Sequence, residues 1–219
     1  MKLLIVRGYG NVMNLKTYNC QEIGLAKALS RKGIECGIVF FNGKQENRVE
    51  SIKVDDNKEI RVYWLKGISL MKHGIMSSID GVIDDYDIVW VNEFNQYTSY
   101  KICKRKDKKV IIYHGPYSPT YSAARLIKEY IFNKLFFRKS TGDSIQVITK
   151  SELATSELKK IGFKKVNTLG VGLDIEGLEK ISETPDIVSE LKRIKEKNGN
   201  ILTYVGAIDD RRNTIFLLH

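Results

Sequence analysis

The feature that most constrains the fold is a series of short apolar runs separated by segments with helical periodicity. Residues 3–7, 34–41, 87–92 and 109–114 are largely apolar throughout, with no regular alternation between apolar and polar positions. Continuous runs of this length are typical of strands that are buried on both faces of a parallel sheet. The sequence therefore predicts an α/β fold: a doubly wound (Rossmann-like), mostly parallel sheet with helices on both faces.

The segments between these runs predict the connecting elements. Gly33 follows a clear helical pattern and is a typical helix-ending residue. A second helical pattern is weaker, because Gly74 and Gly81 interrupt it. Helices are predicted at residues 18–32, 70–83 and 96–106, and two shorter strands at 49–54 and 60–65.

Composition narrows the class of protein. The net charge of +10 over 219 residues favours anionic partners, such as phosphorylated small molecules or anionic lipid headgroups. The sequence has no zinc-ligand spacing, RNA-binding aromatic motif or long basic tail, so we expect no nucleic acid partner. Cys20, Cys36 and Cys103 are scattered, as in proteins of a reducing cytoplasm, and no apolar run is long enough to span a membrane.

Ligands of doubly wound proteins bind beyond the carboxyl ends of the strands. In this chain those ends are Arg7-Gly8, Asn92-Glu93 and His114-Gly115. We expect these three loops to form the candidate site.

His114 is the most informative residue of the three loops. Ser118 and Pro119 follow it and are typical of a helix start, so His114 lies close to a predicted helix N-terminus. Positive potential at that place suits a sugar hydroxyl or a phosphate. The alternative is a structural histidine that caps a loop.

The first loop, Gly8-Tyr9-Gly10-Asn11, follows the first strand and precedes a predicted helix. Glycines at such a place allow the backbone to approach a diphosphate, although the full G-x-G-x-x-G motif is not present. The alternative is that the two glycines only make a tight turn.

One passage of the chain resembles a known family. Residues 144–174 are predicted as a buried strand, a helix, a short strand and a Gly-rich turn, and residues 201–213 as a strand followed by a basic loop. In that order they resemble the interdomain passage of GT-B glycosyltransferases, most closely the retaining enzymes of family 4. The matching residues are Thr149, Ser151, Gly170 to Asp174, Tyr204 to Gly206, and Arg211 to Asn213.

The resemblance implies a glycosyltransferase that moves a sugar from a nucleotide-diphosphate-sugar donor to an acceptor hydroxyl, with retention. It implies His114 as a catalytic residue near the donor sugar. It also implies no cofactor and no metal, since the diphosphate is stabilised by basic side chains and helix N-termini. The implied donor-binding residues are Gly8, Gly10, Asn11, Gly206, Arg211 and Arg212.

The basic loop departs from the family pattern at one position. Ala207 stands where the family has its first Arg, and Arg212 stands where it has a Lys. Arg211 or Arg212 would then supply the bidentate contacts to the diphosphate.

The acceptor is expected to be a saccharide or a lipid-linked saccharide, in cell-surface polysaccharide or glycolipid synthesis. Glu93 follows a strand end and is a candidate for contact with acceptor hydroxyls, with an exposed loop carboxylate as the alternative. The candidate acceptor-binding residues are Tyr9, Asn14, Glu93, Asn95 and Tyr117.

A further helix predicted over residues 119–138 carries two phenylalanines among three cations on one face. Such a face is typical of a surface that docks on an anionic membrane. The protein is thus expected to be cytoplasmic and peripheral on the inner face of the membrane. The alternative is that the two phenylalanines pack beneath a neighbouring loop. The residues of this predicted membrane face are Arg125, Lys128, Phe132, Phe136 and Lys139.

Three parts are predicted along the chain. Residues 1–180 form an N-terminal acceptor-side domain, residues 181–199 a charged helical linker with Pro185 at a break, and residues 200–219 the start of a C-terminal donor-binding domain. The 219 residues alone are therefore expected to be inactive. Two alternatives remain: a non-catalytic nucleotide-sugar-binding or recruiting module, and another doubly wound nucleotide-sugar enzyme such as an epimerase or dehydrogenase.

Overall fold

The computed structural model describes residues 1–15, 20–115, 130, 145–174, 186–197 and 199–201. The chain divides into two compact units, Met1–Asp174 and Ile175–His219, and each is described by itself. The predicted end of the first domain at residue 180 lies outside the described residues, so the three-part division stays a prediction.

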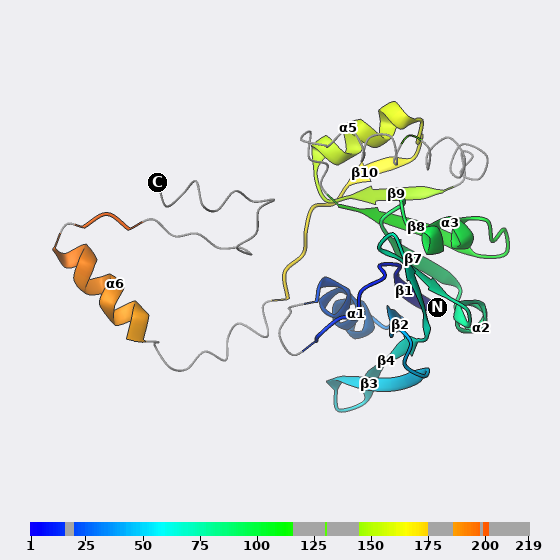
Figure 1. Ribbon diagram of the computed structural model, residues 1–219, viewed down its shortest axis with the longest axis horizontal. Helices are drawn as coiled ribbons and strands as arrows, with labels where there is room; N and C mark the ends of the chain where they lie inside the picture. Colours follow the sequence, from blue (N-terminus) through cyan, green and yellow to red (C-terminus); the bar gives the residue numbers. More distant parts are fainter. Residues whose placement is uncertain (16–19, 116–129, 131–144, 175–185, 198, 202–219) are drawn as a thin grey trace. The chain divides into compact units, whose positions relative to one another are not determined.

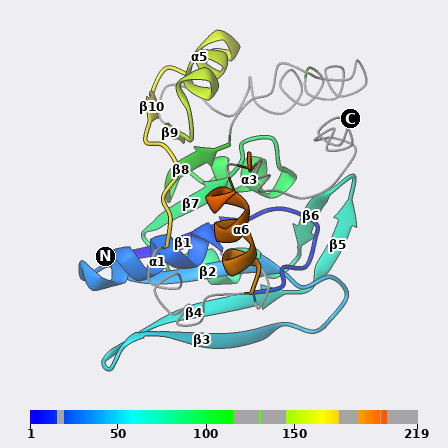
Figure 2. The same ribbon diagram turned by 90° about the vertical axis from the view of Figure 1, so that its left-hand side faces the viewer.

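Within the described part of the first unit, eight strands form one sheet in the order β10-β9-β8-β7-β1-β2-β4-β3. Neighbouring strands are parallel, except that β3 is antiparallel to β4 at one edge. The predicted mostly parallel, doubly wound sheet is therefore confirmed (Figures 1 and 2). The strands are β1 (Lys2–Arg7), β2 (Glu35–Phe41), β3 (Arg48–Asp55), β4 (Lys58–Leu65), β7 (Ile88–Asn92), β8 (Lys109–His114), β9 (Gln146–Thr149) and β10 (Val166–Thr168).

Helices cover both faces of this sheet. The helix α1 (Gln21–Arg31) packs on one face, where Ala26 joins a core that contains Ile5, Ile38 and Trp90. On the other face, a second core unites side chains of the sheet with those of three helices. These helices are α2 (Ile79–Asp84), α3 (Tyr97–Cys103) and α5 (Glu152–Ile161) (Figure 1).

The two cores explain why the strands are continuously apolar. Successive side chains of a strand point to opposite faces, so each strand must supply apolar residues to both. In β7, Val89 and Val91 enter the core of α2 and α3, whereas Trp90 enters the core of α1. The same alternation continues at the carboxyl ends of the strands, where the side chains are polar.

The predicted helix over residues 70–83 is wrong in its first half. The structure has a hairpin there, made of β5 (Gly67–Leu70) and β6 (His73–Met76), and only α2 is helical. Met71 and Lys72 form the turn with positive φ angles of 50° and 69°, as two-residue hairpin turns require. The hairpin forms in place of a helix because its hydrogen bonds to the Gly8–Asn11 loop outweigh a weak helical pattern that Gly74 interrupts.

The helix α6 (Asp186–Glu196) lies in the second unit, within the segment predicted as a charged helical linker. It buries none of its residues. The predicted helix over residues 119–138, apart from Tyr130, and the predicted strand after residue 201 lie outside the described residues. No described helix combines the length and the apolar character that a membrane span needs.

Candidate functional site

The register of the sheet brings the predicted strand ends together. Arg7 pairs with Asn92 across β1 and β7, and Asn92 pairs with Tyr113 across β7 and β8. His114 pairs with Thr149 across β8 and β9. The polar residues that end or follow these strands therefore share one edge of the sheet.

A buried pair of polar side chains, Glu93 and His114, lies at this edge. Nδ1 of His114 is 2.6 Å from Oε2 of Glu93, and both side chains are nearly inaccessible. The other carboxylate oxygen, Oε1, accepts a hydrogen bond of 2.9 Å from the backbone N–H of Gly115. Nζ of Lys150 lies 3.9 Å from the same oxygen. Glu93 is thus enclosed by a histidine ring, a lysine ammonium and a peptide N–H, and the alternative of an exposed loop carboxylate is wrong.

The backbone of Glu93 is in the left-handed region, with φ of 64°. A non-glycine residue in this region carries a conformational cost, and such residues gather at functional sites. The surroundings fix this conformation, since the N–H of Glu93 donates a 2.8 Å hydrogen bond to the carbonyl of Tyr113. A Cβ atom on Gly115 would lie 2.6 Å from Oε1 of Glu93, so glycine is needed for the carboxylate to reach that loop.

The pKa of Glu93 reflects these neighbours. Burial alone would raise it, but the hydrogen bond and charge of His114, the ammonium of Lys150 and the N–H of Gly115 together lower it below its usual value. Glu93 is therefore an anion at neutral pH. Burial, with the Glu93 charge nearby, raises the pKa of the Tyr9 hydroxyl, which also hydrogen-bonds to Glu93.

The Gly8–Asn11 loop has a well-defined structural role. The N–H of Gly10 donates to the carbonyl of Lys72, and the N–H of Gly74 donates to the carbonyl of Gly8, so the loop pairs with β6. A Cβ atom on Gly10 would come within 2.2 Å of the Ser69 hydroxyl. Close packing against the hairpin therefore explains Gly10, and its donor-binding role stays a prediction.

The other predicted site residues differ in their surroundings. Asn95 is half-buried and Asn14 is exposed, and Oδ1 of the exposed Asn11 accepts a 3.4 Å hydrogen bond from Arg7. Several predicted residues lie outside the described residues, and their roles stay predictions. They are Tyr117, Gly206, Arg211, Arg212 and the membrane face Arg125, Lys128, Phe132, Phe136 and Lys139.

The segment that carries the family resemblance begins with structural contacts. The Thr149 hydroxyl lies 2.5 Å from that of Thr155, which is 2.6 Å from that of Thr168. The Ser151 hydroxyl caps α5 by accepting a 3.2 Å hydrogen bond from the N–H of Ala154. These two matching residues therefore fix the β9–α5 connection, and Lys150 between them carries the charge that faces Glu93.

A second polar cluster lies on the α1 face of the same strands. Glu22, a buried residue of α1, accepts hydrogen bonds from the Asn92 amide and from the Cys20 thiol, the latter at 2.8 Å. Nε of Arg7 is 3.7 Å from the Glu22 carboxylate, and the Arg7 guanidinium lies over the Tyr9 ring at 4.7 Å. Glu22 and Lys150 were not predicted from the sequence. The strand-end rule marks Arg7 and Asn92, but no sequence pattern indicates a helical Glu that folds onto them.

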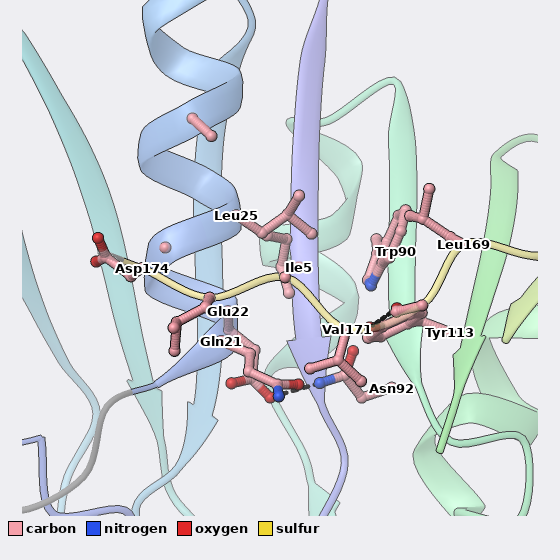
Figure 3. Close-up of a pocket in the computed structure, with 15 residues that line it drawn as sticks. Ile5, Gln21, Glu22, Leu25, Trp90, Asn92, Tyr113, Leu169, Val171 and Asp174 are labelled. Carbon is pink, nitrogen blue, oxygen red and sulfur yellow. Dashed lines mark hydrogen bonds between the residues drawn. The ribbon is translucent and has the colours of Figure 1, made fainter. Parts of the chain in front are cut away.

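A cavity of about 370 Å³ opens beside this second cluster (Figure 3). It lies between α1, the strands β1, β7 and β8, and the extended segment that follows β10. The hydroxyl of Tyr113 holds this segment by donating a 2.8 Å hydrogen bond to the carbonyl of Gly170. The residues that line it include Glu22, Leu25, Ala28, Trp90, Asn92 and Tyr113, and Leu169, Val171 and Leu173 of the extended segment.

On one face of the sheet, the Glu93 carboxylate is enclosed by its neighbours. On the α1 face, the strand ends line an open pocket. The described residues include no group of three or more His, Cys, Asp or Glu that could hold a metal ion.

No protein-family model matches this sequence, and no curated protein matches it. Similar solved structures include "Trehalose-6-phosphate from E. coli bound with UDP-2-fluoro glucose", with 12% identity, a TM-score of 0.47 and coverage of 88% of this chain and 54% of that chain. Another is the catalytic domain of starch synthase IV from Arabidopsis thaliana bound to ADP and acarbose, with 15% identity, a TM-score of 0.43 and coverage of 80% and 52%. The chain thus spans about half the length of these structures.

Proposed function

We propose that this chain is the acceptor-side part of a GT-B glycosyltransferase, similar to the retaining enzymes of family 4. The protein would transfer a sugar from a nucleotide-diphosphate-sugar donor to an acceptor hydroxyl. The observation that carries the proposal is the Glu93–His114 pair. It joins two carboxyl-terminal strand ends of a doubly wound sheet, with Glu93 held in a left-handed backbone conformation. Ligands of such folds bind at this edge.

The pair suits a reaction in which charge develops on a leaving diphosphate. In this proposal Glu93 fixes the orientation of the His114 ring through Nδ1. Lys150 adds a cationic side chain beside the same carboxylate. Preorganised positive charge of this kind lowers the barrier to departure of an anionic group. In this proposal His114 acts at the donor sugar, and Arg211 and Arg212 bind the diphosphate.

The proposed acceptor is a saccharide, free or linked to a lipid. The proposal places Tyr9 and Glu93 on the acceptor side, with Glu93 acting through Tyr9 and His114, because its own carboxylate is enclosed. The proposed pathway is synthesis of a cell-surface polysaccharide or glycolipid in the cytoplasm, on the inner face of the membrane.

The test is sugar transfer by the natural full-length protein and its His114→Ala variant. A panel of nucleotide sugars is supplied with saccharide and lipid-linked acceptors, and release of the nucleoside diphosphate is followed. We expect His114→Ala to lower turnover by roughly 10²–10³, the usual effect of removing one electrostatic contact to a developing charge.

His73→Ala is the matched control, because His73 also makes a side-chain hydrogen bond, at 3.0 Å to Gln96, but lies in the β5–β6 hairpin. We expect it to retain most of the turnover. A folded His114→Ala variant with wild-type turnover would show that His114 is structural. Binding of nucleotide sugar without transfer to any acceptor would favour the recruiting module instead.

The membrane part of the proposal is tested separately by co-sedimentation with anionic vesicles at low and high salt. Each cation near an anionic surface contributes about 1 kcal/mol, so Arg125→Glu/Lys128→Glu should weaken binding strongly. Phe132→Ser/Phe136→Ser should weaken it by removing apolar burial. If the wild-type protein does not bind at low salt, or if the variants bind equally well, the acceptor is proposed to be soluble instead.

A further inference from the structure

The cavity on the α1 face combines features that point to a ligand. Its volume of about 370 Å³ lies in the range of small-molecule sites. It lies on the face of the sheet opposite the Glu93–His114 pair, because Asn92 and Tyr113 each precede a member of that pair by one residue.

One end of the cavity is polar and rich in acceptors. The Asn92 amide donates to the Glu22 carboxylate, which fixes its orientation, as Figure 3 shows. Oδ1 of Asn92 has no hydrogen-bond partner among the described residues, although the residue is only 6% exposed. A buried acceptor without a partner costs about 1–3 kcal/mol, so a ligand that donates to it gains affinity. Glu22 places a carboxylate next to it.

The walls of the cavity are aromatic and aliphatic. The rings of Trp90 and Tyr113 lie 5.2 Å apart at an interplanar angle of 46° and come from neighbouring strands. Leu25 of α1 and Val171 of the extended segment line the cavity with them. The negative faces of aromatic rings attract the weakly positive C–H groups of a ligand.

The segment after β10 forms one side of the cavity and is anchored at two points. The Tyr113 hydroxyl holds the carbonyl of Gly170, and the carboxylate of Asp174 lies 3.8 Å from Nζ of Lys27 on α1. Leu169, Val171 and Leu173 nevertheless leave more than half of their surface exposed while lining the cavity. A ligand in the cavity would cover part of this apolar surface.

We propose that this cavity binds a saccharide ring, at a site separate from the Glu93–His114 pair. Two adjacent acceptors, the Glu22 carboxylate and Oδ1 of Asn92, call for two adjacent donors, which vicinal hydroxyls supply. The C–H face of the sugar ring then packs on Trp90. This site does not depend on the proposed transfer reaction.

The test uses Trp90 as a reporter of the cavity. The chain has two tryptophans, and Trp64→Phe leaves Trp90 alone. Glucose, maltose and maltotriose are titrated into this variant, with adenosine as a flat-ring comparison. We expect a saturable change in Trp90 emission with at least one of the sugars, at a dissociation constant on the order of 1 mM. Calorimetry on the wild-type chain gives the same constant without the Trp64 substitution.

Two cavity variants locate the binding. Asn92→Ala removes the unpartnered acceptor and should weaken sugar binding about tenfold. Ala28→Phe, at an exposed position of α1 that lines the cavity, should abolish binding by filling it while leaving the core intact. Asn42→Ala is the matched control, because Asn42 is equally buried and also has an Oδ1 without a partner among the described residues, but does not line this cavity.

The outcomes separate this proposal from the alternatives. Loss of binding in Asn92→Ala and Ala28→Phe, with retention in Asn42→Ala and His114→Ala, supports it. Wild-type affinity in both cavity variants would place the sugar elsewhere and overturn it. Binding of adenosine alone, or of no probe at all, would also overturn it, and neither result would bear on sugar transfer at His114.

Discussion

The two faces of the sheet differ sharply at the edge where β7 and β8 end. On the face of α2 and α3, Glu93 and His114 lie 2.6 Å apart, and the ring of His114 packs on that of Phe94. On the face of α1, one residue earlier in each strand, Asn92 and Tyr113 line an open cavity. Side-chain alternation along the strands creates this division, so a single pair of strands supplies two different environments.

The two faces differ in how completely their buried polar groups are paired. The carboxylate of Glu93 has a histidine, a lysine and a peptide N–H around it. Asn92, equally buried, has a partner for its amide nitrogen and none for its oxygen among the described residues. Buried polar groups that are fully paired fix the local conformation. A buried acceptor without a hydrogen-bond partner can instead gain binding free energy from a ligand that donates to it.

The largest expected effect on stability comes from removing the carboxylate of Glu93. Glu93→Ala leaves the buried His114 ring and the half-buried Lys150 ammonium without their carboxylate. Removal of one partner from a buried pair costs about 3–5 kcal/mol, so we expect a loss of that size in the free energy of unfolding. Denaturant unfolding with a linear extrapolation measures it. A loss under about 1 kcal/mol would show that the pair is not closed in solution.

The second prediction concerns acid and uses the same carboxylate. The pKa of Glu93 is lowered in the folded protein below its usual value near 4.5. Its stabilising effect is therefore complete above about pH 4.5 and is lost as the pH falls through the folded-state pKa. We expect the wild-type free energy of unfolding to decline below that pH more steeply than that of Glu93→Gln. Equal slopes for the two proteins would contradict the lowered pKa.

The strands and two residues of the closed face could be predicted from the sequence. Continuous apolar runs predicted the strands, and the rule that ligands lie at carboxyl ends marked Glu93 and His114. The hairpin of β5 and β6 could not be predicted, because its pairing with the Gly8–Asn11 loop is a contact across about 60 residues and its turn residues, Met71 and Lys72, are not typical of such turns.

The cavity on the α1 face could not be predicted from the sequence either. Glu22 is the second residue of α1, a position where a solvent-exposed carboxylate normally stabilises the helix N-terminus. Only the packing of α1 on the sheet turns it toward Asn92 and Arg7. Long-range packing of this kind leaves no periodic signal in one sequence.

The third prediction tests the open face. Asn92→Ala loses a hydrogen bond to a charged carboxylate but also removes the buried oxygen that has no partner among the described residues. The two effects oppose each other, so we expect a net loss of only about 1 kcal/mol in the free energy of unfolding. The same denaturant measurement compares it with Glu93→Ala. A loss as large as that of Glu93→Ala would remove the contrast between the two faces.

The smallest expected effect tests the left-handed backbone conformation of residue 93. Glu93→Gly and Glu93→Ala both remove the carboxylate, and they differ in how well they tolerate the φ of 64° at this position. A left-handed conformation costs alanine about 1–2 kcal/mol, while glycine pays roughly 0.5–1 kcal/mol in lost chain entropy. We therefore expect Glu93→Gly to be more stable than Glu93→Ala by about 0.5–1 kcal/mol in paired unfolding experiments. If alanine is the more stable of the two, the left-handed conformation depends on the carboxylate itself and relaxes when the Glu93–His114 pair is removed.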